Sequence, residues 1–223
     1  MQVTEIYSSI QGESSFAGLP CIFVRLTGCN LRCNWCDSEY TFTGGVKMSV
    51  DEVMGEVRRL SSVKLVEITG GEPMLQQREV VPLMQQLVAD GYTVLLETSG
   101  ERPLATVPVE VIKIVDVKCP DSGEENSFDL ANLAALTPRD ELKFVLSSRG
   151  DYEFARDFLK QHAPLAVAIF SPAFRKDAQG TRDAANCLLD PQQLAEWILA
   201  HGLQVRLGLQ LHKFIWQPEL KGV

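Results

Sequence analysis

The sequence of 223 residues lacks any apolar run near the roughly 18 residues that a membrane span requires. Its longest apolar runs, such as residues 165–170, have the length of a buried strand. The first residues also lack the basic and then apolar pattern of a secretory signal. We therefore expect a cytoplasmic protein that has no membrane-spanning segment.

An excess of basic charge is also missing. The chain has 21 Lys and Arg against 29 Asp and Glu, and its net charge is −8. A protein that grips the phosphate backbone of a nucleic acid needs a basic surface. Repeats, charge blocks and Gly/Ser linkers are absent too. We therefore predict one domain over residues 1–223, with no direct nucleic-acid partner.

Short β-branched segments alternate along the chain with longer amphipathic ones. The predicted strands cover residues 21–26, 65–69, 93–97, 111–117, 142–146, 166–170 and 204–209, and the predicted helices cover 49–60, 76–90, 151–162 and 191–201. This alternation is typical of a mostly parallel sheet. Because a complete barrel of eight such units takes about 250 residues, we predict an α/β fold with an incomplete TIM-like barrel.

Segments whose residue types can bind a ligand or a metal directly follow these predicted strands. They are residues 28–29, 70–73, 98–100, 116–118, 171–172 and 210–213. In open parallel sheets, ligands bind at the carboxyl ends of the strands. We therefore expect these segments to meet on one face of the molecule.

The six cysteines divide into a close triplet and three isolated residues. The isolated ones are Cys21, Cys119 and Cys187. They lie in apolar stretches, and we predict that they are buried small hydrophobic residues. Disulfide frameworks are typical of small secreted domains. The triplet Cys29, Cys33 and Cys36, in the loop after the first predicted strand, therefore indicates a metal site.

The triplet leaves two kinds of metal site open. Three thiolates are one fewer than a closed zinc site or a fully ligated iron–sulfur cluster uses. A zinc knuckle would borrow Cys21 or a histidine as its fourth ligand. A four-iron cluster on three cysteines would instead keep one iron open to a small molecule.

The spacing C-x3-C-x2-C, with Trp35 before the last cysteine, resembles the signature of the radical S-adenosylmethionine (SAM) superfamily. Ile68-Thr69-Gly70-Gly71-Glu72-Pro73 is similar to its GGEP element, which meets the amino group of SAM. The glycines allow close approach of the backbone, and a carboxylate suits an ammonium group. The resemblance implies a 4Fe–4S cluster on the three cysteines and SAM on the fourth iron, cleaved to a 5′-deoxyadenosyl radical. The implied cofactor contacts are Trp35, Asp37, Gly70, Gly71, Glu72, Ser99, Asp116, Val117 and Lys118.

Further segments resemble one branch of this superfamily, the 7-carboxy-7-deazaguanine synthases. Ser9-Ile10-Gln11-Gly12-Glu13 is similar to a stretch that meets the pterin substrate in that branch. Arg25 matches an arginine that pairs with a substrate carboxylate, which suits its planar guanidinium. Cys36-Asp37-Ser38 matches a sequence whose hydroxyl ligates Mg²⁺, a cation that takes few protein ligands. Glu97-Thr98-Ser99-Gly100 and Gln210-Leu211-His212-Lys213 match two further elements of the branch.

The resemblance also implies which side chains bind the substrate and the metal. The implied substrate contacts are Ile10, Gln11, Gly12, Glu13, Arg25, Thr69, Glu97, Gln210 and His212, and the implied magnesium ligand is Ser38. No catalytic residue beyond the cofactor and metal ligands is implied.

The implied reaction converts 6-carboxy-5,6,7,8-tetrahydropterin to 7-carboxy-7-deazaguanine with loss of ammonia, in queuosine-type 7-deazapurine biosynthesis. Its cofactors are the 4Fe–4S cluster, SAM and Mg²⁺, and its partners are a second copy of the chain and an electron donor such as flavodoxin. Two other functions remain open. One is another small radical SAM enzyme, such as a glycyl-radical activating enzyme, in which Arg25 and Ser38 would share no purpose. The other is a zinc-binding module without catalysis.

Two features depart from the pattern of the branch. Ser14 stands where the family has glycine, so we expect different backbone angles in that loop. The chain also continues past Lys213 to Val223, and we assign no substrate contact to its terminal carboxylate. For the polar segment 174–186, a lid and a plain surface loop both remain open.

Overall fold

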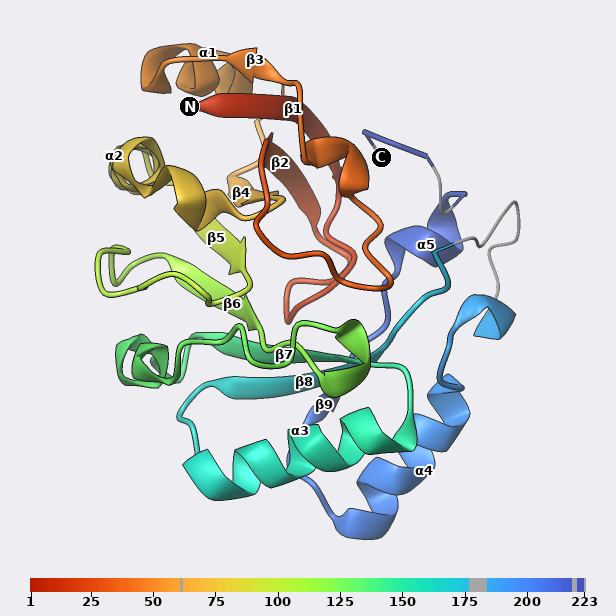
Figure 1. The fold of residues 1–223 in the computed structure, drawn as a ribbon. Helices are drawn as coiled ribbons and strands as arrows, with labels where there is room; N and C mark the ends of the chain where they lie inside the picture. The colour runs from red at the N-terminus through yellow and green to blue at the C-terminus, as the bar shows by residue number, and fades with distance from the viewer. Residues whose placement is uncertain (61, 177–183, 218–219, 223) are drawn as a thin grey trace.

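The computed structural model describes residues 1–60, 62–176, 184–217 and 220–222. In these residues a single sheet has the strand order β3-β1-β2-β4-β5-β6-β7-β8-β9 (Figure 1). The strands are β1 Gln2–Ile10, β2 Pro20–Leu26, β3 Val46–Lys47, β4 Leu65–Gly70, β5 Thr93–Thr98, β6 Ile112–Asp116, β7 Glu141–Leu146, β8 Val167–Pro172 and β9 Arg206–Leu207. Neighbours from β2 to β9 are parallel, and β1 is antiparallel to both β2 and β3. The sheet has two open edges, β3 and β9, and so forms the predicted incomplete barrel.

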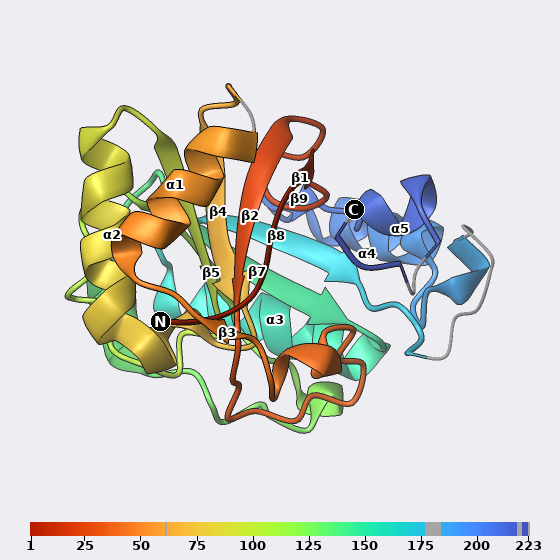
Figure 2. The same cartoon turned by 90° about the horizontal axis from the view of Figure 1, so that it is seen from above.

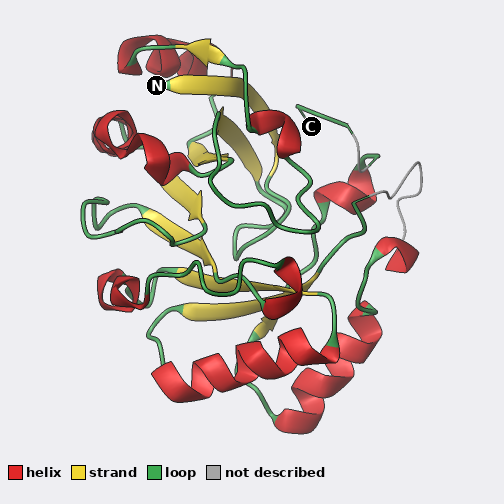
Figure 3. Cartoon of the chain, viewed as in Figure 1, coloured by secondary structure: helices red, strands yellow, loops and turns green. Residues whose placement is uncertain are grey.

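The longer helices lie outside the curved sheet, as Figures 2 and 3 show. They are α1 Val50–Leu60, α2 Gln77–Ala89, α3 Arg149–His162 and α4 Pro191–His201, followed by the single turn α5 His212–Ile215. Short 3-10 helices are η1 Glu39–Thr41, η2 Pro73–Gln76, η3 Pro120–Ser122, η4 Leu130–Ala135 and η5 Ala184–Asn186. α1 and α2 pack beside β1 and β5, whereas α3 and α4 pack on β7 and β8. No helix in the described ranges is long and apolar enough to cross a bilayer.

Capping residues explain why the helix predictions agree with the structure. Before α1, the backbone N–H of Ser49 donates to the Glu52 carboxylate at 2.7 Å, and Glu52 N–H donates back to Ser49 Oγ at 3.2 Å. This reciprocal pair satisfies two donors that the helix start leaves open. α4 begins after the N-cap Asp190 and ends at Gly202, which takes the left-handed conformation favoured at that position.

Three differences from the prediction have local causes. α3 begins at Arg149, two residues before the predicted start, because Ser148 caps it by accepting from Asp151 N–H. β1 and β3 were not predicted, since most of β1 is half-buried and shows no clear apolar alternation, and β3 has two residues. The last strand is shorter than predicted because β9 has β8 as its one neighbour.

The main core lies between the sheet and the helices. Val24, Ile68 and Leu96, from successive strands, belong to one cluster with Leu83 of α2, and all four side chains are fully buried. Each such side chain contributes roughly 1.5–3 kcal/mol by leaving water. The isolated residues Cys21, Cys119 and Cys187 are buried, as the sequence predicted.

Candidate active site

The inner face of the sheet changes from apolar to charged along the strands. Leu65 and Leu95 belong to a small inner cluster, and Glu67 and Glu97 follow two residues later on the same strands. Because side chains alternate across a strand, residues two apart share a face. The same rule applies on the neighbouring strands, and the resulting charged floor consists of Arg25, Glu67, Glu97, Asp116 and Lys143.

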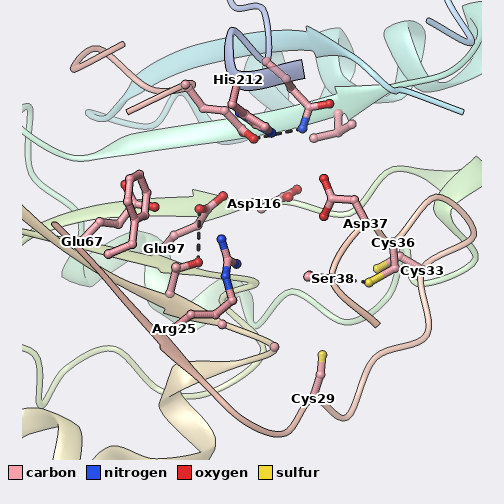
Figure 4. A pocket seen from close by; sticks show the side chains of 18 of the residues that line it. Arg25, Cys29, Cys33, Cys36, Asp37, Ser38, Glu67, Glu97, Asp116 and His212 are labelled. Carbon is pink, nitrogen blue, oxygen red and sulfur yellow. Dashed lines mark hydrogen bonds between the residues drawn. The ribbon is translucent and has the colours of Figure 1, made fainter. Parts of the chain in front are cut away.

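A pocket opens above this floor at the carboxyl ends of the strands (Figure 4). All the predicted site residues line it except Glu72 and Val117, which are buried behind its wall. Five of the six segments expected on one face thus contribute to a single pocket. The segment 171–172 does not line the pocket; it forms the buried end of β8.

The cysteine loop between β2 and η1 is held by hydrogen bonds from several segments. Gly28 N–H donates to Thr41 O at 2.7 Å, and Asn34 N–H donates to Ser122 O at 3.0 Å. The cysteines themselves are half-buried. Burial raises the pKa of Cys29, and it raises the pKa of Cys33 to about 11 although Lys118 opposes the shift.

The arrangement of the three thiols fits a cluster with several irons. Figure 4 shows Cys29 set apart from Cys33 and Cys36, with the pocket between them. Within the described part of the chain, no three His, Cys, Asp or Glu side chains gather closely enough to hold a single metal ion. A 4Fe–4S cluster uses separated thiolates because each one binds a different iron. The bound irons would also favour the thiolate forms that burial disfavours.

Gly70, the last residue of β4, and Gly71 after it are required by close packing, Gly70 against the end of β2 and Gly71 against the cysteine loop. A Cβ on Gly71 would lie 2.2 Å from Gly28 O and 2.7 Å from Cys29 Cβ. A Cβ on Gly70 would lie 2.4 Å from Leu26 O, and the φ of Gly70 is +147°. The resemblance explained these glycines by an approach to SAM. In the structure their immediate role is to let the end of β4 approach the end of β2 and the cysteine loop.

Glu72 has a comparable positioning task. Its carboxylate accepts hydrogen bonds from Thr98 Oγ1 at 2.7 Å, from Ser99 N at 2.8 Å and from Ser99 Oγ at 2.7 Å. It also accepts from Met74 N at 2.9 Å. Glu72 therefore fixes Ser99 on the pocket wall, and its predicted contact with SAM stays a prediction.

The segment 10–13 forms a tight contact with the C-terminal part of the chain. A Cβ on Gly12 would lie 2.2 Å from His212 Nδ1, so a larger residue does not fit there. Gln11 Nε2 donates to Glu67 at 2.8 Å, and Gln11 Oε1 accepts from Glu13 N–H at 2.6 Å. The amide of Gln11 thus ties this loop to the pocket floor.

Lys143 is the basic centre of the floor. Its ammonium lies 2.6 Å from Glu13 Oε2, hydrogen-bonds Glu97, and is 3.7 Å from Asp116. Burial alone would raise the pKa of Glu13, but Lys143 and His212 outweigh burial and lower it to about 2. Burial likewise opposes the charge of Lys143, yet its acidic neighbours raise its pKa well above the usual range.

Two other floor carboxylates differ from Glu13. Burial and the neighbouring Glu97 raise the pKa of Glu67 well above its ordinary value, so this side chain favours the neutral form. Asp116 accepts from Lys118 at 2.8 Å through Oδ2, whereas its buried Oδ1 has no hydrogen-bond partner. Asp116 lines the pocket, so this oxygen is a candidate acceptor for a hydrogen bond from a ligand. Burial lowers the pKa of His212, which favours the neutral ring.

Arg25 and Ser38 both line the pocket, and their predicted tasks stay predictions. Arg25 Nε donates to Glu5 at 3.0 Å and its NH2 donates to Tyr7 at 2.9 Å, which fixes the guanidinium at the pocket. Tyr40 also donates to Glu5, at 2.7 Å. Ser38 is the N-cap of η1, yet its hydroxyl makes no capping bond and lines the pocket.

The two departures from the family pattern have structural outcomes. Ser14 has a φ of +59°, the left-handed backbone that glycine favours, and the expected difference from the loop of the family stays a prediction. Gln217, Leu220 and Lys221 of the C-terminal extension line the pocket. Val223, and residues 177–183 of the unassigned polar segment, lie outside the described residues.

Sequence reasoning missed several residues of the pocket. They are Tyr7, Tyr40, Glu67, Lys143 and the described residues of the C-terminal extension. Glu67 and Lys143 did leave a signal, since each is a single charge within an otherwise apolar strand. A buried charge needs a partner. The partners come from other segments, Gln11 and Glu13 from the loop after β1 and Glu97 and Asp116 from other strands, and a strand's own sequence does not specify them.

Comparisons with known proteins agree with this geometry. The radical SAM superfamily profile matches residues 23–160, more than half of the chain. A 7-carboxy-7-deazaguanine synthase of Koribacter versatilis is 69% identical, with full coverage of both chains. A 7-carboxy-7-deazaguanine synthase of Chlorobaculum tepidum is 42% identical, covering 100% of this chain and 97% of that one.

Solved structures are similar in fold. The crystal structure of QueE from Escherichia coli has a TM-score of 0.73 at 23% identity, covering 95% of this chain and 94% of that one. Streptococcus suis SuiB, bound to the precursor peptide SuiA, has a TM-score of 0.52 at 9% identity. That match covers 84% of this chain and 47% of SuiB. The predicted α/β fold with a partial barrel is thereby confirmed.

Proposed function

The chain belongs to the 7-carboxy-7-deazaguanine synthase family of the radical SAM superfamily, and from this premise we propose how its own residues carry out that reaction. The substrate is 6-carboxy-5,6,7,8-tetrahydropterin, which is converted to 7-carboxy-7-deazaguanine and ammonia. Product and ammonia together contain all the atoms of the substrate, so the reaction has no net oxidation or reduction. It belongs to the biosynthesis of 7-deazapurines such as queuosine.

Cys29, Cys33 and Cys36 hold a 4Fe–4S cluster in this proposal, and SAM lies beside it. The cluster and SAM together supply a carbon radical that removes a hydrogen atom from the substrate and is later restored. Trp35, Asp116 and Lys118 line the part of the pocket nearest the loop and bind SAM. The buried Oδ1 of Asp116, which lacks a partner, accepts a hydrogen bond from it.

The charged floor orients the pterin. Arg25, already fixed by Glu5 and Tyr7, pairs with the substrate carboxylate through its remaining N–H groups. The hydroxyl of Ser38, not used in capping, binds Mg²⁺ together with oxygen atoms of the substrate. Glu13, Glu97 and His212 supply acceptors and donors for the polar edge of the pterin ring.

One observation carries this proposal. The three cysteines, Ser38, Arg25 and the segment 10–13 line one pocket together with Glu97, Gln210 and His212 from distant parts of the chain. A glycyl-radical activating enzyme or a zinc module would need the cysteines alone. A pterin lyase needs the whole set.

The proposal is tested by anaerobic reconstitution with iron and sulfide, followed by reduction and addition of SAM, Mg²⁺ and the carboxytetrahydropterin. We expect formation of the deazaguanine acid, measured by ultraviolet absorbance and mass. A chain that cleaves SAM but leaves the pterin unchanged would overturn the substrate. A chain that takes up no cluster under anaerobic handling would support zinc instead.

The Mg²⁺ site is tested by Ser38→Ala. We expect this variant to lose most of its Mg²⁺ activation while it keeps its iron content and its SAM binding, because the hydroxyl is the proposed magnesium ligand and its contact with Cys36 Sγ is long, at 3.8 Å. Ser38→Thr retains the hydroxyl and serves as the control that keeps the activation. Equal Mg²⁺ dependence in Ser38→Ala and the wild type would contradict the assignment.

The proposal extends to the setting of the enzyme. It works in the cytoplasm as a homodimer and receives its electrons from a small carrier such as flavodoxin. The molar mass from light scattering at micromolar concentration tests the dimer, since a monomer has a mass of 24.7 kDa. Turnover with reduced flavodoxin as the sole reductant tests the donor.

A further inference from the structure

We propose that Lys213 is a positioning residue that holds the end of the cysteine loop, residues 36–38, at the pocket and connects it to the substrate segment 10–13. The inference deepens the proposed function and rests on it, because that loop end carries the third cysteine and Ser38. Lys213 closes the segment 210–213 that resembles an element of the branch, but the resemblance assigns this lysine no task.

Lys213 is buried between two acceptors from different segments. Its side chain is 6% exposed, and Nζ lies 2.7 Å from Asp37 Oδ2. The same ammonium donates to Gln210 Oε1 at 3.0 Å. A buried ammonium needs such acceptors because it has left water. The pair therefore fixes Asp37 relative to α5 more strongly than a surface ion pair does.

The other parts of the cysteine loop have different anchors. Its beginning is held through Gly28, and its middle is held through Arg32 N–H, which donates to Glu124 at 2.6 Å, and through Asn34. Asp37 lies between Cys36 and Ser38, so its link to Lys213 fixes the position of both neighbours. In the loaded enzyme Cys36 would also be held by its iron, so a displaced Asp37 would displace chiefly the hydroxyl of Ser38.

The contact continues from Lys213 to the pocket floor. Gln210 accepts from Lys213, and its Nε2 donates to Glu13 at 2.9 Å. Glu13 then pairs with Lys143 at 2.6 Å. A chain of direct polar contacts thus connects the loop end that carries Ser38 with the segment proposed to meet the pterin. Loss of its first member should affect the use of Mg²⁺ and substrate more than the cleavage of SAM.

A neighbouring ion pair provides a matched control. Lys176 Nζ lies 2.5 Å from Glu39 Oε1, two residues after Asp37, and both side chains are about half exposed, at 49% and 46%. It also joins a lysine from a distant segment to the end of the same loop. Because it is solvated, its removal should change little.

The first experiment uses hydrogen–deuterium exchange on the metal-free chain, followed by mass spectrometry of peptides that cover residues 29–42. We expect Lys213→Met to raise exchange in this segment by about tenfold, since an anchor that opposes local opening is lost. Lys176→Met should leave exchange at the wild-type level. Because no cofactor is present, this readout does not depend on the proposed reaction.

The second experiment measures the reconstituted variants. Lys213→Met should raise both the Mg²⁺ half-saturation and the KM for the pterin by about tenfold, with an iron content like that of the wild type. Lys213→Arg, which keeps the charge, should bring both the Mg²⁺ half-saturation and the KM for the pterin most of the way back to the wild-type values. Asp37→Asn alters the half-exposed partner of Lys213 and should shift the same two quantities. It serves as the test if Lys213→Met does not fold.

The outcomes separate the two proposals. Wild-type exchange and kinetics in both Lys213→Met and Asp37→Asn would overturn the positioning role. Altered kinetics with unchanged exchange would also overturn it, because Lys213 would then act on the substrate directly. Increased exchange in Lys213→Met, together with a wild-type enzyme that forms no product, would support the positioning role and overturn the proposed function.

Discussion

Lys143 determines the energetics of the pocket floor at the scale of single residues. Its side chain is 4% exposed and faces Glu13, Glu97 and Asp116. A buried charge that loses a partner leaves the remaining charges uncompensated, and such losses cost several kcal/mol. The floor is therefore built for binding, and each of its charges depends on the others.

Replacement of Glu13 by Gln should lower the free energy of unfolding by about 3 kcal/mol at pH 7, because Lys143 loses its ion pair with Glu13 at a buried position. Urea denaturation followed by circular dichroism measures the change. Glu153→Gln is the control, since Glu153 pairs with Arg149 while 48% exposed. We expect that variant to change stability by less than about 0.5 kcal/mol. Equal effects of the two substitutions would contradict the role of burial.

The stability difference between the wild type and Glu13→Gln should also depend on pH. The pKa of Glu13 is lowered from 4.5 to about 2 in the folded chain. A depressed carboxyl pKa stabilises the fold above the unfolded value, and this contribution disappears as the pH falls through the folded value. The stability difference between wild type and Glu13→Gln should therefore be constant above about pH 5 and shrink toward pH 2. A difference that stays constant down to pH 2 would show that charge is not its source.

Residues of the site were predictable where a motif spans neighbouring positions. The cysteines, Ser38 and the segment 10–13 are local patterns, and the structure brings them to one pocket. Glu67 and Lys143 are single charges within apolar strands, and their partners are set by the register between strands. A sequence read one segment at a time does not contain that register.

At the scale of elements, the turn after β4 determines where the cysteine loop lies. Gly71 packs so closely against Gly28 and Cys29 that a Cβ would overlap both. Both contacts are to backbone or to a Cβ, so neither can rotate away. The GGEP turn is thus a spacer between two loops as well as a wall of the pocket.

Gly71→Ala should therefore move the cysteine loop. We expect a loss of about 1–3 kcal/mol in unfolding free energy, together with an iron content below that of the wild type after reconstitution. Gly55→Ala is the matched control, because Gly55 lies exposed within α1 with nothing within 4 Å of its added Cβ. Alanine favours a helix over glycine by about 1 kcal/mol, so this variant should gain stability at unchanged iron content. Full iron content in Gly71→Ala would contradict the spacer role.

Helices were easier to predict than the strands at the edge of the sheet. Ser49, Glu52, Asp190 and Gly202 mark helix ends within the sequence itself. The sequence of β1 has no such local signal for its ends. β1 forms because it pairs with the edge of β2 over the whole range from Ile10↔Pro20 to Val3↔Leu26. Pairing between strands is a tertiary interaction, and it overrides weak local preference.

At the scale of the whole molecule, the core and the metal site are separate. The main hydrophobic cluster extends from Met1 and Val3 to Ile198 and includes none of the three cysteines of the loop. Those cysteines are half-buried in a loop at the pocket, above the carboxyl ends of the strands. The core therefore has no need of a metal, in contrast to small zinc modules that are unfolded without one.

This separation predicts that the chain stays folded after its metal is removed. Chelation and dialysis should leave the far-ultraviolet circular dichroism and a single cooperative urea transition intact, with a loss of stability of at most about 2 kcal/mol. Exchange should increase mainly in the loop 28–38, because that segment alone loses its ligand. If metal removal abolished the cooperative transition, the metal would be part of the core. That result would favour a zinc module over an enzyme that binds its cofactor in a preformed barrel.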